Sequence, residues 1–528
     1  MLARARSAVD QATLDRLIVV GLVVVAALLR FVDLPTRGTW DADQGNDMLV
    51  LRAFVFDGRL PLLGPPTSIG DFHHGVLYYY LLAPAAALTG ANPLGVVAAI
   101  ALAGVLAVAV TWWLARAIGG PVAGAVAGLL MAVSASAIDE STFIWNPNLI
   151  ALSSSIALVG AWRAWTSGRA RWWVVAAAGA IVTMHCHVLG SILLPAIAGL
   201  LVADIRRRPA GAERSARLQL LIVSAGMLLA SYVPLAVHEL THDFSETRAA
   251  LDFVAGAGEG SAVALPVRFV IVGLRVLAWP LTGLLTSAPA AAILATAVVI
   301  AFVAWRSTRA AGPERTAAQW FGLTLGWSIL ALTFAASGLA TVIPGLPNDH
   351  YHAFADPIVF VVVGLGVAAL WRTPAASGVR VGAVTATGLV ATLVAFNLAT
   401  LPPGRHPDGG WPAARTAGDR ILAATGTTDP IVLDSLPVFK PPNAVRFPLE
   451  AAGADAPIAP GVAGAADDAA APSGSARLVV LCDNLFESAI GAVCGGPAED
   501  ARVAGRAFTL EDRFEAAPGR WISVYLPG

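Results

Sequence analysis

Acidic and histidine side chains gather in one segment of this chain, between residues 40 and 80. The segment contains Asp41, Asp43, Asp47, Asp71, His73 and His74. Carboxylates in a loop can accept a proton from an attacking hydroxyl or amine, hold a divalent metal ion, or keep the loop hydrated. A single loop aspartate usually does the last of these, but this concentration, followed by Tyr78-Tyr79-Tyr80, favours a chemical role. Tyrosines in such a place also serve as anchors at a membrane surface.

Three further polar turns lie far away in the sequence. They hold Asp139, Glu140 and Asn146, then His185 and His187, and then His350, Tyr351 and His352. Asn146 precedes Pro147 and is either only the N-cap of the next helix or both a cap and a site residue. A lone histidine is usually a satisfied polar contact, but polar residues at membrane depth tend to be functional. We therefore expect these turns to converge with the acidic loop on one cavity.

The composition is that of a protein that folds in a lipid bilayer. Hydrophobic residues make up 57% and charged residues 13% of the 528 positions. Apolar runs of about 20 residues, the length of a helix that crosses a bilayer, predict an all-α polytopic fold with about eleven transmembrane helices. The expected spans are Leu17–Leu34, Leu94–Leu114, Val122–Ile138, Leu149–Trp165, Trp172–His185, His187–Val202, Leu218–Val237, Ala288–Trp305, Trp320–Val342, Pro357–Leu370 and Val381–Thr400. The first run follows a basic start and has no cleavage site, so it is interpreted as an uncleaved anchor.

The arginines predict how these spans are oriented, since positive residues flank the cytoplasmic ends of membrane helices. Arg4, Arg6 and Arg16 place the N-terminus in the cytoplasm, so that the loop 35–93 and the chain after residue 400 lie outside. We expect a multi-pass protein of the plasma (inner) membrane whose residues 1–400 form the transmembrane catalytic domain. The apolar stretches Val76–Leu88 and Leu265–Leu285 do not fit this pattern as spans. They are expected to be helices that lie on the outer face or dip into it.

Residues 401–528 are expected to form a small, soluble α/β domain outside the cytoplasm. The boundary is marked by Leu401-Pro402-Pro403-Gly404, and short apolar runs such as 431–433 and 478–481 indicate strands. The Ala/Gly/Asp/Pro-rich piece Ala451–Ser475 is predicted to be a flexible insertion. Cys482 and Cys494 are either a disulfide, which an oxidising compartment permits, or two free thiols.

Some functional classes lack their signals in this sequence. There is no Gly-x-x-x-x-Gly-Lys-Ser/Thr loop, no Gly-x-Gly-x-x-Gly after a strand and no Cys-x-x-Cys pair. A nucleotide-driven pump and a cytosolic nucleotide-sugar enzyme are therefore disfavoured. No nucleic acid is expected as a partner.

The order of several motifs resembles that of bacterial glycosyltransferase family 39 proteins, relatives of the protein O-mannosyltransferases and the lipid A aminoarabinose transferases. The motifs are Asp-Ala-Asp-Gln-Gly-Asn-Asp (41–47), Leu-Pro-Leu-Leu-Gly-Pro-Pro-Thr-Ser (60–68), His-His-Gly-Val-Leu-Tyr-Tyr-Tyr (73–80) and Phe-Ile-Trp-Asn-Pro-Asn (143–148). The resemblance covers residues 15–200 well, the later spans loosely and the tail hardly at all. It implies the GT-C membrane fold, a polyprenyl-phosphate sugar as donor, and an acidic residue of the first external loop as the catalytic carboxylate.

The resemblance assigns the catalytic role to Asp43, which occupies the Asp of the family's Asp-Glu pair. Gln44 stands in place of the Glu, so it stays open whether Asp41 supplies a second carboxylate. Thr142 stands where the family often has an arginine. With Asp43 as the general base, a single displacement would invert the anomeric carbon. The departing phosphate would be contacted by Arg52, Arg59, His73, His74 or an arginine of the 265–285 segment.

Further side chains are expected to bind substrate around Asp43: His73, His74, Tyr78, Asp139, Glu140, Asn146, His187, His350 and Tyr351. The expected partners are the polyprenyl-phosphate sugar, membrane lipids and an extracytoplasmic acceptor that is a lipid, a glycan or a protein. No cofactor is required by this scheme, although Asp41 and Asp43 could bind a divalent metal ion. A transporter or flippase of lipid-linked saccharides and a noncatalytic scaffold are the alternatives. A polar cavity at one face favours the enzyme, whereas a polar path through the midplane favours transport.

Overall fold

The computed structural model describes residues 2–67, 72–256, 263–341, 348–374, 380–428, 430–465, 476–504 and 507–528, with side chains from residue 10 onward. Asp71 of the acidic loop and the last part of the predicted insertion, 466–475, lie outside the described residues.

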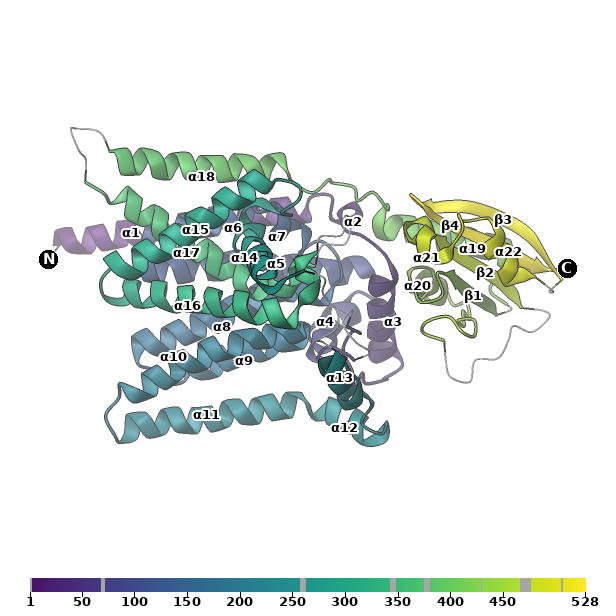
Figure 1. The fold of residues 1–528 in the computed structure, drawn as a ribbon, viewed down its shortest axis with the longest axis horizontal. Helices are drawn as coiled ribbons and strands as arrows, with labels where there is room; N and C mark the ends of the chain where they lie inside the picture. Colours follow the sequence, from purple (N-terminus) through teal and green to yellow (C-terminus); the bar gives the residue numbers. More distant parts are fainter. Residues whose placement is uncertain are drawn as a thin grey trace.

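Residues up to 399 form a bundle of helices whose long members run side by side. The N-terminus lies at one end of the bundle and the C-terminal domain lies beyond the other (Figure 1), which we call the domain-facing end. The long helices are α1 (Leu2–Phe31), α5 (Pro93–Gly119), α8 (Ile150–Ser167), α11 (Ala212–Ser231), α14 (Leu265–Thr282), α15 (Pro289–Arg309), α16 (Gly312–Ala335), α17 (Asp356–Trp371) and α18 (Val381–Ala399). The 13-residue helix α10 (Leu194–Arg206) reaches a similar length only together with the 3-10 turn that precedes it. The shorter ones are α2 (Leu34–Arg37), α3 (Ala42–Phe56), α4 (Leu77–Leu88), α6 (Pro121–Val133), α7 (Ala135–Asp139), α9 (Trp172–Cys186), α12 (Val233–Thr241) and α13 (Ser245–Gly256). Four 3-10 turns complete the bundle: η1 (Asn146–Leu149), η2 (Val188–Leu193), η3 (Ser337–Ala340) and η4 (Asp349–Ala355).

The lengths and compositions of these helices agree with the expected polytopic membrane fold. Of the described helices, nine are long and apolar enough to cross a membrane, or ten if α11 and α12, which are bent by 42°, form one span. Large apolar side chains are exposed on the outside of the bundle, as contact with lipid requires; examples are Leu17, Ile222, Leu294 and Val384. Two of the eleven expected spans are shorter than this criterion, since α6 has 13 residues and α9 has 15.

The helix that begins at Pro121 is broken by a buried cation from α1. Arg30 is 1% exposed, and its guanidinium donates to the carbonyls of Met131 and Ala132 in the last turn of α6 and to that of Ala137 in α7. The last carbonyls of a helix have no partners within it and carry its negative partial charge. Arg30 therefore satisfies the end of α6, and α7 continues after Ser134.

The sequence predicts that Leu265–Leu285 lies at the outer face, and the contacts of α14 agree with a place across the domain-facing ends of its neighbours. Near its start, Arg268 donates to the carbonyl of Thr333 in the last turn of α16 (3.2 Å). Near its end, the carbonyl of Pro280 accepts from Ser134, between α6 and α7 (2.8 Å). By length and composition alone α14 could also cross a membrane.

At the opposite end of the bundle, one buried carboxylate joins three helices. Asp204 in α10 accepts hydrogen bonds from Arg217 in α11 (2.6 Å) and from the indole of Trp173 in α9 (3.1 Å). Arg207 also pairs with it, at 2.7 Å. The side chains of Asp204 and Arg217 are 0% and 1% exposed, so each charge is compensated inside the protein.

The C-terminal domain is a four-stranded sheet with helices, as the sequence predicts. The strand order is β1-β2-β4-β3, with β1 (Ile431–Leu436) and β2 (Arg477–Asp483) parallel and the pairs of β4 (Arg520–Pro527) with β2 and with β3 (Phe508–Ala517) antiparallel. Its helices are α19 (Gly410–Thr425), α20 (Asn443–Ala451), η5 (Asn484–Phe486), α21 (Glu487–Ile490) and α22 (Pro497–Val503). Of the two alternatives for Cys482 and Cys494, the structure has the disulfide.

The prediction of a flexible insertion from Ala451 is wrong over its first part. The backbone N–H groups of Ile431 and Leu433 in β1 donate to the carbonyls of Asp455 and Pro457 (2.9 and 2.8 Å). Ile458 is 6% exposed and packs in the core of the domain. Its small residues and prolines are typical of a linker. A segment at the edge of a sheet can nevertheless be ordered by backbone hydrogen bonds and a few apolar contacts, whatever its composition.

Candidate active site

The acidic loop forms α3, and Asp41 is the N-cap of this helix. The Asp41 side chain accepts from backbone N–H groups of the first turn, and its own N–H donates to the side chain of Gln44 (2.9 Å), which completes a capping box. The amide nitrogen of Gln44 donates to the carbonyl of Ile144 (2.8 Å). A glutamate at position 44 would have no proton for this second bond, so the departure from the family's Asp-Glu pair has a structural use here.

Asp43 and Asp47 lie one helical turn apart on α3 in contrasting surroundings. Asp47 is 2% exposed, and its two carboxylate oxygens accept from the hydroxyls of Tyr78 and Tyr79 in α4 (2.8 Å each). Asp43 reaches solvent, and no hydrogen bond or ion pair reaches its carboxylate from any residue that the structure describes. Surrounding protein atoms nevertheless desolvate the carboxylate in part. This desolvation, followed by the charge of Asp41, raises the pKa of Asp43 to about 6, and burial raises the pKa of Asp47 to about 7.

The C-terminal domain holds the start of this loop. Lys440 and Arg520 both pair with Asp41 (2.9 Å each), and Lys440 also pairs with Asp483 (2.7 Å). The indole N–H of Trp40 donates to the carbonyl of Ala444 in α20 (2.9 Å). The backbone N–H of Trp40 donates to Asp408 (3.0 Å).

Three histidines from three segments form a buried cluster at the domain-facing end. The ring of His187 lies 4.6 Å from that of His74 and 5.4 Å from that of His350, measured between ring centroids, and 5.2 Å from the ring of Tyr351. Trp145 packs on His350 at 4.2 Å. The Nδ1 atoms of His74 and His187 accept backbone N–H groups, which requires neutral rings. Burial, followed by the charge of His73, lowers the pKa of His74 to about 3.

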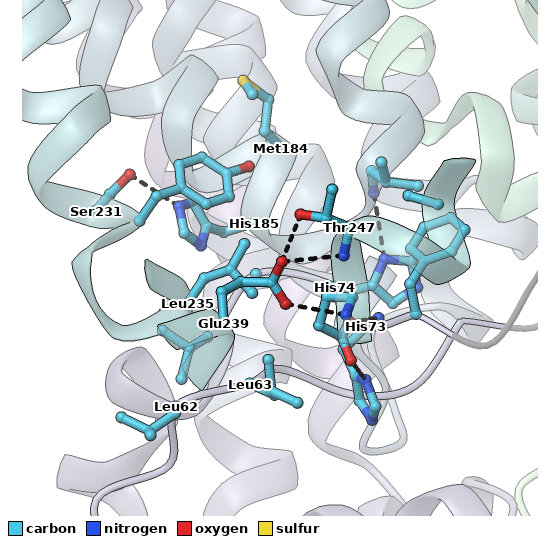
Figure 2. Close-up of a pocket in the computed structure, with 17 residues that line it drawn as sticks. Leu62, Leu63, His73, His74, Met184, His185, Ser231, Leu235, Glu239 and Thr247 are labelled. Carbon is cyan, nitrogen blue, oxygen red and sulfur yellow. Dashed lines mark hydrogen bonds and ion pairs between the residues drawn. The ribbon is translucent and has the colours of Figure 1, made fainter. Parts of the chain in front are cut away.

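His73 and His74 border a cavity of about 250 Å³ between the acidic loop and the helices α9, α11, α12 and α13 (Figure 2). Glu246 at the start of α13 accepts from His73 through both the ring (2.9 Å) and the backbone N–H (2.7 Å). Glu239 accepts the backbone N–H of Thr247 (3.1 Å) and so caps the same helix (Figure 2). Both glutamates thus have structural partners. The cavity is lined by His73 and His74 but not by Asp43.

Asp139 and Glu140 end α7 and face different neighbours. Asp139 is exposed at its surface. The protein atoms around it partly desolvate its carboxylate, which raises its pKa, whereas the charges of His406 and Arg37 lower it. Glu140 accepts from the indole of Trp279 (3.3 Å).

Asn146 is not the N-cap that its sequence context suggested. Trp145 holds that position, with no side-chain cap. The Asn146 amide instead donates to the carbonyl of Cys186, at the end of α9. Asparagine followed by proline is common at helix starts. Here, however, the side-chain amide of Asn146 donates to a carbonyl 40 residues away in the sequence.

Short chains of contacts connect most of the expected site residues. Asp43 is followed by Gln44, which bonds Ile144, two residues before Asn146. Asn146 bonds the residue before His187, whose ring touches those of His74, His350 and Tyr351. Tyr78 reaches the acidic helix through Asp47. The structure thus brings these residues to the domain-facing end together, whereas, among the described residues, no such chain of contacts includes the side chain of Asp139, whose pKa is influenced by the charges of His406 and Arg37.

The expected phosphate contacts are spread more widely. Arg275 in α14 is 2% exposed and makes two bonds to Asp349 (2.8 and 2.7 Å), so its charge is already paired. Arg52 and Arg59 lie toward the far end of α3 or beyond it, more than two turns from Asp43. His73 and His74 are described above.

Sequence reasoning missed the cations of the C-terminal domain, Lys440 and Arg520. One signal was available, since Lys440 is the only lysine of the chain. In the part of the chain that the structure describes, no group of three or more His, Cys, Asp and Glu side chains is arranged to hold a metal ion.

Residues 73–233 match the family model of the dolichyl-phosphate-mannose-protein mannosyltransferases. A comparison with curated proteins found no match. Among solved structures, the chain is similar to ArnT from Cupriavidus metallidurans in the apo state, with a TM-score of 0.61 and 14% identity over 96% of this chain and 97% of that one. For ArnT bound to undecaprenyl phosphate the TM-score is 0.62, with 13% identity over the same shares of the two chains, 96% and 97%.

An oligosaccharyltransferase from Archaeoglobus fulgidus, tethered to an acceptor peptide, is similar with a TM-score of 0.50 and 14% identity, over 97% of this chain and 74% of that one. At these identities the similarity concerns the fold. The chain therefore has the GT-C fold that the sequence resemblance implied, with a multi-pass helical bundle and a small C-terminal sheet domain.

Proposed function

We propose that this chain, a family 39-like protein with the GT-C fold, is a membrane glycosyltransferase that moves a sugar from a polyprenyl-phosphate donor to an acceptor outside the cytoplasm. The family match over residues 73–233 supports the class of reaction. The similarity to ArnT, which has been solved with undecaprenyl phosphate bound, supports the class of donor. The acceptor is a lipid, a glycan or a protein that carries a nucleophilic hydroxyl or amine.

The observation that carries this proposal is the separation of roles among the carboxylates of the acidic loop. Asp41 is held as a helix cap by two cations, and Asp47 is tied to two tyrosines. Asp43 is exposed, no residue that the structure describes makes a hydrogen bond or ion pair to its carboxylate, and its pKa is raised to about 6. A general base works best when its pKa lies near the working pH and its oxygens are free to take a proton. Asp43 meets both conditions.

The reaction is a single displacement. The acceptor oxygen or nitrogen attacks the anomeric carbon, the bond from this carbon to the phosphate oxygen breaks, and the electron pair leaves with the polyprenyl phosphate. Asp43 takes the acceptor's proton. Because the nucleophile enters opposite the leaving group, the configuration at the anomeric carbon inverts. The protein's work is alignment, proton removal and stabilisation of the phosphate.

An apolar groove fits the lipid part of the donor. It measures about 460 Å³, lies between α14, α15 and α16, and is lined by Phe269, Gly273, Thr296, Val303, Gly322 and Ile329, among others. α14 also reaches the domain-facing end, where Arg275 and Trp279 contact the polar turns. A prenyl chain in this groove would keep its phosphate at that end.

Two observations support an active site outside the cytoplasm rather than a transport path. The Cys482–Cys494 disulfide belongs to an oxidising compartment. Side-chain pairs inside the bundle, such as Thr111 with Ser155 and Ser153 with Thr183, are hydroxyl pairs, whereas the histidines and carboxylates of the candidate site gather at the domain-facing end.

The test uses the purified chain in lipid nanodiscs with a panel of polyprenyl-phosphate sugars, and measures release of the free lipid phosphate. Asp43→Asn keeps the size of the side chain but removes proton acceptance, so kcat should fall by roughly 10² to 10⁴ while the KM for the donor changes little. Asp57→Asn is the matched control, since Asp57 is an exposed carboxylate at the other end of α3. Full activity in Asp43→Asn would refute the assignment.

A further inference from the structure

Lys440, the only lysine in the chain, joins the C-terminal domain to the acidic loop. It lies between β1 and α20, and its Nζ is 2.9 Å from Asp41 and 2.7 Å from Asp483 at the end of β2. Its side chain is 11% exposed. The amine is therefore fixed between a carboxylate of its own domain and one of the loop that begins α3.

The same domain holds the other oxygen of Asp41. Arg520 in β4 pairs with Asp41 Oδ1 (2.9 Å), whereas Lys440 takes Oδ2. Arg520 also donates to the carbonyl of Trp40 (3.0 Å). Since Asp41 is the N-cap of α3 and Asp43 belongs to its first turn, these two cations determine where the candidate base stands.

Backbone packing makes this contact rigid. A Cβ atom on Gly45 would overlap the carbonyl of Asn443 at the start of α20, so the two helices meet without an intervening side chain. Next to this contact, the ring of Trp40 packs on those of Trp411 and Phe447 (4.7 and 5.7 Å between centroids).

Four ionisable groups interact electrostatically with Asp43. Asp41 precedes it in the loop, Asp47 follows one turn later, and Lys440 belongs to the C-terminal domain; the fourth group, Tyr79 of α4, is a neutral phenol that donates to Asp47. Asp41 opposes ionisation of Asp43, and Lys440 favours it. A base must be ionised before it can accept a proton.

We propose that Lys440 is a positioning residue of the transfer site. It holds Asp41, and with it the first turn of α3, against the C-terminal domain, and it keeps a positive charge beside Asp43 so that this carboxylate is ionised when the acceptor arrives. The C-terminal domain is thereby a part of the active site. The inference rests on the proposed role of Asp43 as the base.

The test compares Lys440→Met, which removes the charge, with Lys440→Arg, which keeps it, by measuring kcat and KM against pH in the full chain. For Lys440→Met, the acidic limb of the profile should move to higher pH by about one unit, as expected for the loss of one neighbouring charge. Turnover should then fall about fivefold near pH 6, approach a tenfold loss at lower pH, and recover at pH 8 to 9. Lys440→Arg should keep the wild-type limb. Arg420→Met is the control, because Arg420 pairs with Asp512 on the surface of the same domain.

Two results would overturn the inference: a Lys440→Met profile identical to the wild type, or a loss of activity that is the same at every pH, which is what a purely structural link would give. If thermal unfolding shows that Lys440→Met is not folded, Lys440→Gln carries the same test, since its amide still donates to the carboxylates. A wild-type chain that releases no lipid phosphate from any donor would count against the proposed function. A wild type and a Lys440→Met variant that transfer equally would count against Lys440 alone.

Discussion

At the scale of single residues, the surroundings of each aspartate in the acidic loop separate their roles. Asp41 is neutralised by two cations, Asp47 is buried between tyrosine hydroxyls, and Asp43 is exposed. Identical carboxyl groups acquire different tasks in this way because desolvation and nearby charge set which one is ionised and reachable.

The pKa of Asp43 predicts a pH dependence of transfer. A protonated Asp43 cannot accept a proton, so activity requires the ionised form and should be lost as the pH falls through about 6. Below that value, kcat/KM should drop about tenfold for each pH unit. The measurement is lipid phosphate release between pH 4.5 and 8. A pH profile of the wild type that is flat would contradict the prediction. If the acidic limb disappears in Asp139→Asn instead, the base is Asp139, the exposed carboxylate at the end of α7.

Removal of metal ions should leave transfer unchanged. A divalent ion on Asp41 would have to displace Lys440 and Arg520, which already occupy its two oxygens. Turnover should therefore be the same before and after dialysis against EDTA. Loss of activity that Mg²⁺ or Mn²⁺ restores would instead make Asp41 and Asp43 a metal site, and Asp43→Asn would then lose metal affinity as well as turnover.

At the scale of elements, the sequence predicted the helices well and their interruptions poorly. A bilayer demands about 20 apolar residues per crossing, so hydropathy alone locates α5, α15 or α18. The break after Val133 depends on Arg30, whose guanidinium bonds carbonyls about a hundred residues away. Asn146 and Asp41 also have partners that are remote in sequence, since Cys186 lies 40 residues from Asn146 and Lys440 lies 399 residues from Asp41. Local patterns do not contain such contacts, which is why residue types at the site could be predicted but not their bonds.

The link between α10 and α11 predicts a stability effect at the end opposite the site. Asp204→Asn leaves the buried guanidinium of Arg217 without its counterion, which should lower the free energy of unfolding by about 3–5 kcal/mol. Glu213→Gln removes an exposed partner of Arg208 and should cost less than about 1 kcal/mol. Denaturant titration in mild detergent measures both. Equal losses in the two variants would contradict the assigned role of Asp204.

At the scale of the whole molecule, the N-terminus and the C-terminal domain lie at opposite ends of a helical bundle whose surface is apolar (Figure 1). We expect these ends to face opposite compartments when the protein is in a membrane. The arginine pattern predicts that the N-terminal end faces the cytoplasm, and the disulfide supports an oxidising compartment for the C-terminal domain.

Single introduced cysteines can test this orientation. The native thiols give no background signal, because Cys186 is buried and the other two cysteines form the disulfide. Ala452→Cys, at an exposed position after α20, should react with a membrane-impermeant maleimide added outside intact cells. Ser215→Cys, at an exposed position in the first turns of α11, should react only after the cells are opened. The reverse pattern would invert the topology.

The contact between Gly45 and Asn443 also restricts how this molecule can diverge. Because a Cβ atom on Gly45 would overlap the backbone of Asn443, a mutation that adds a side chain at position 45 has to be matched by a shift of α20. A foreign domain exchanged for this one at residue 401 would meet an α3 shaped for a different partner. Exchange should succeed only when the loop of residues 35–93 travels with the domain, so these two distant stretches of the gene are expected to be inherited as one unit.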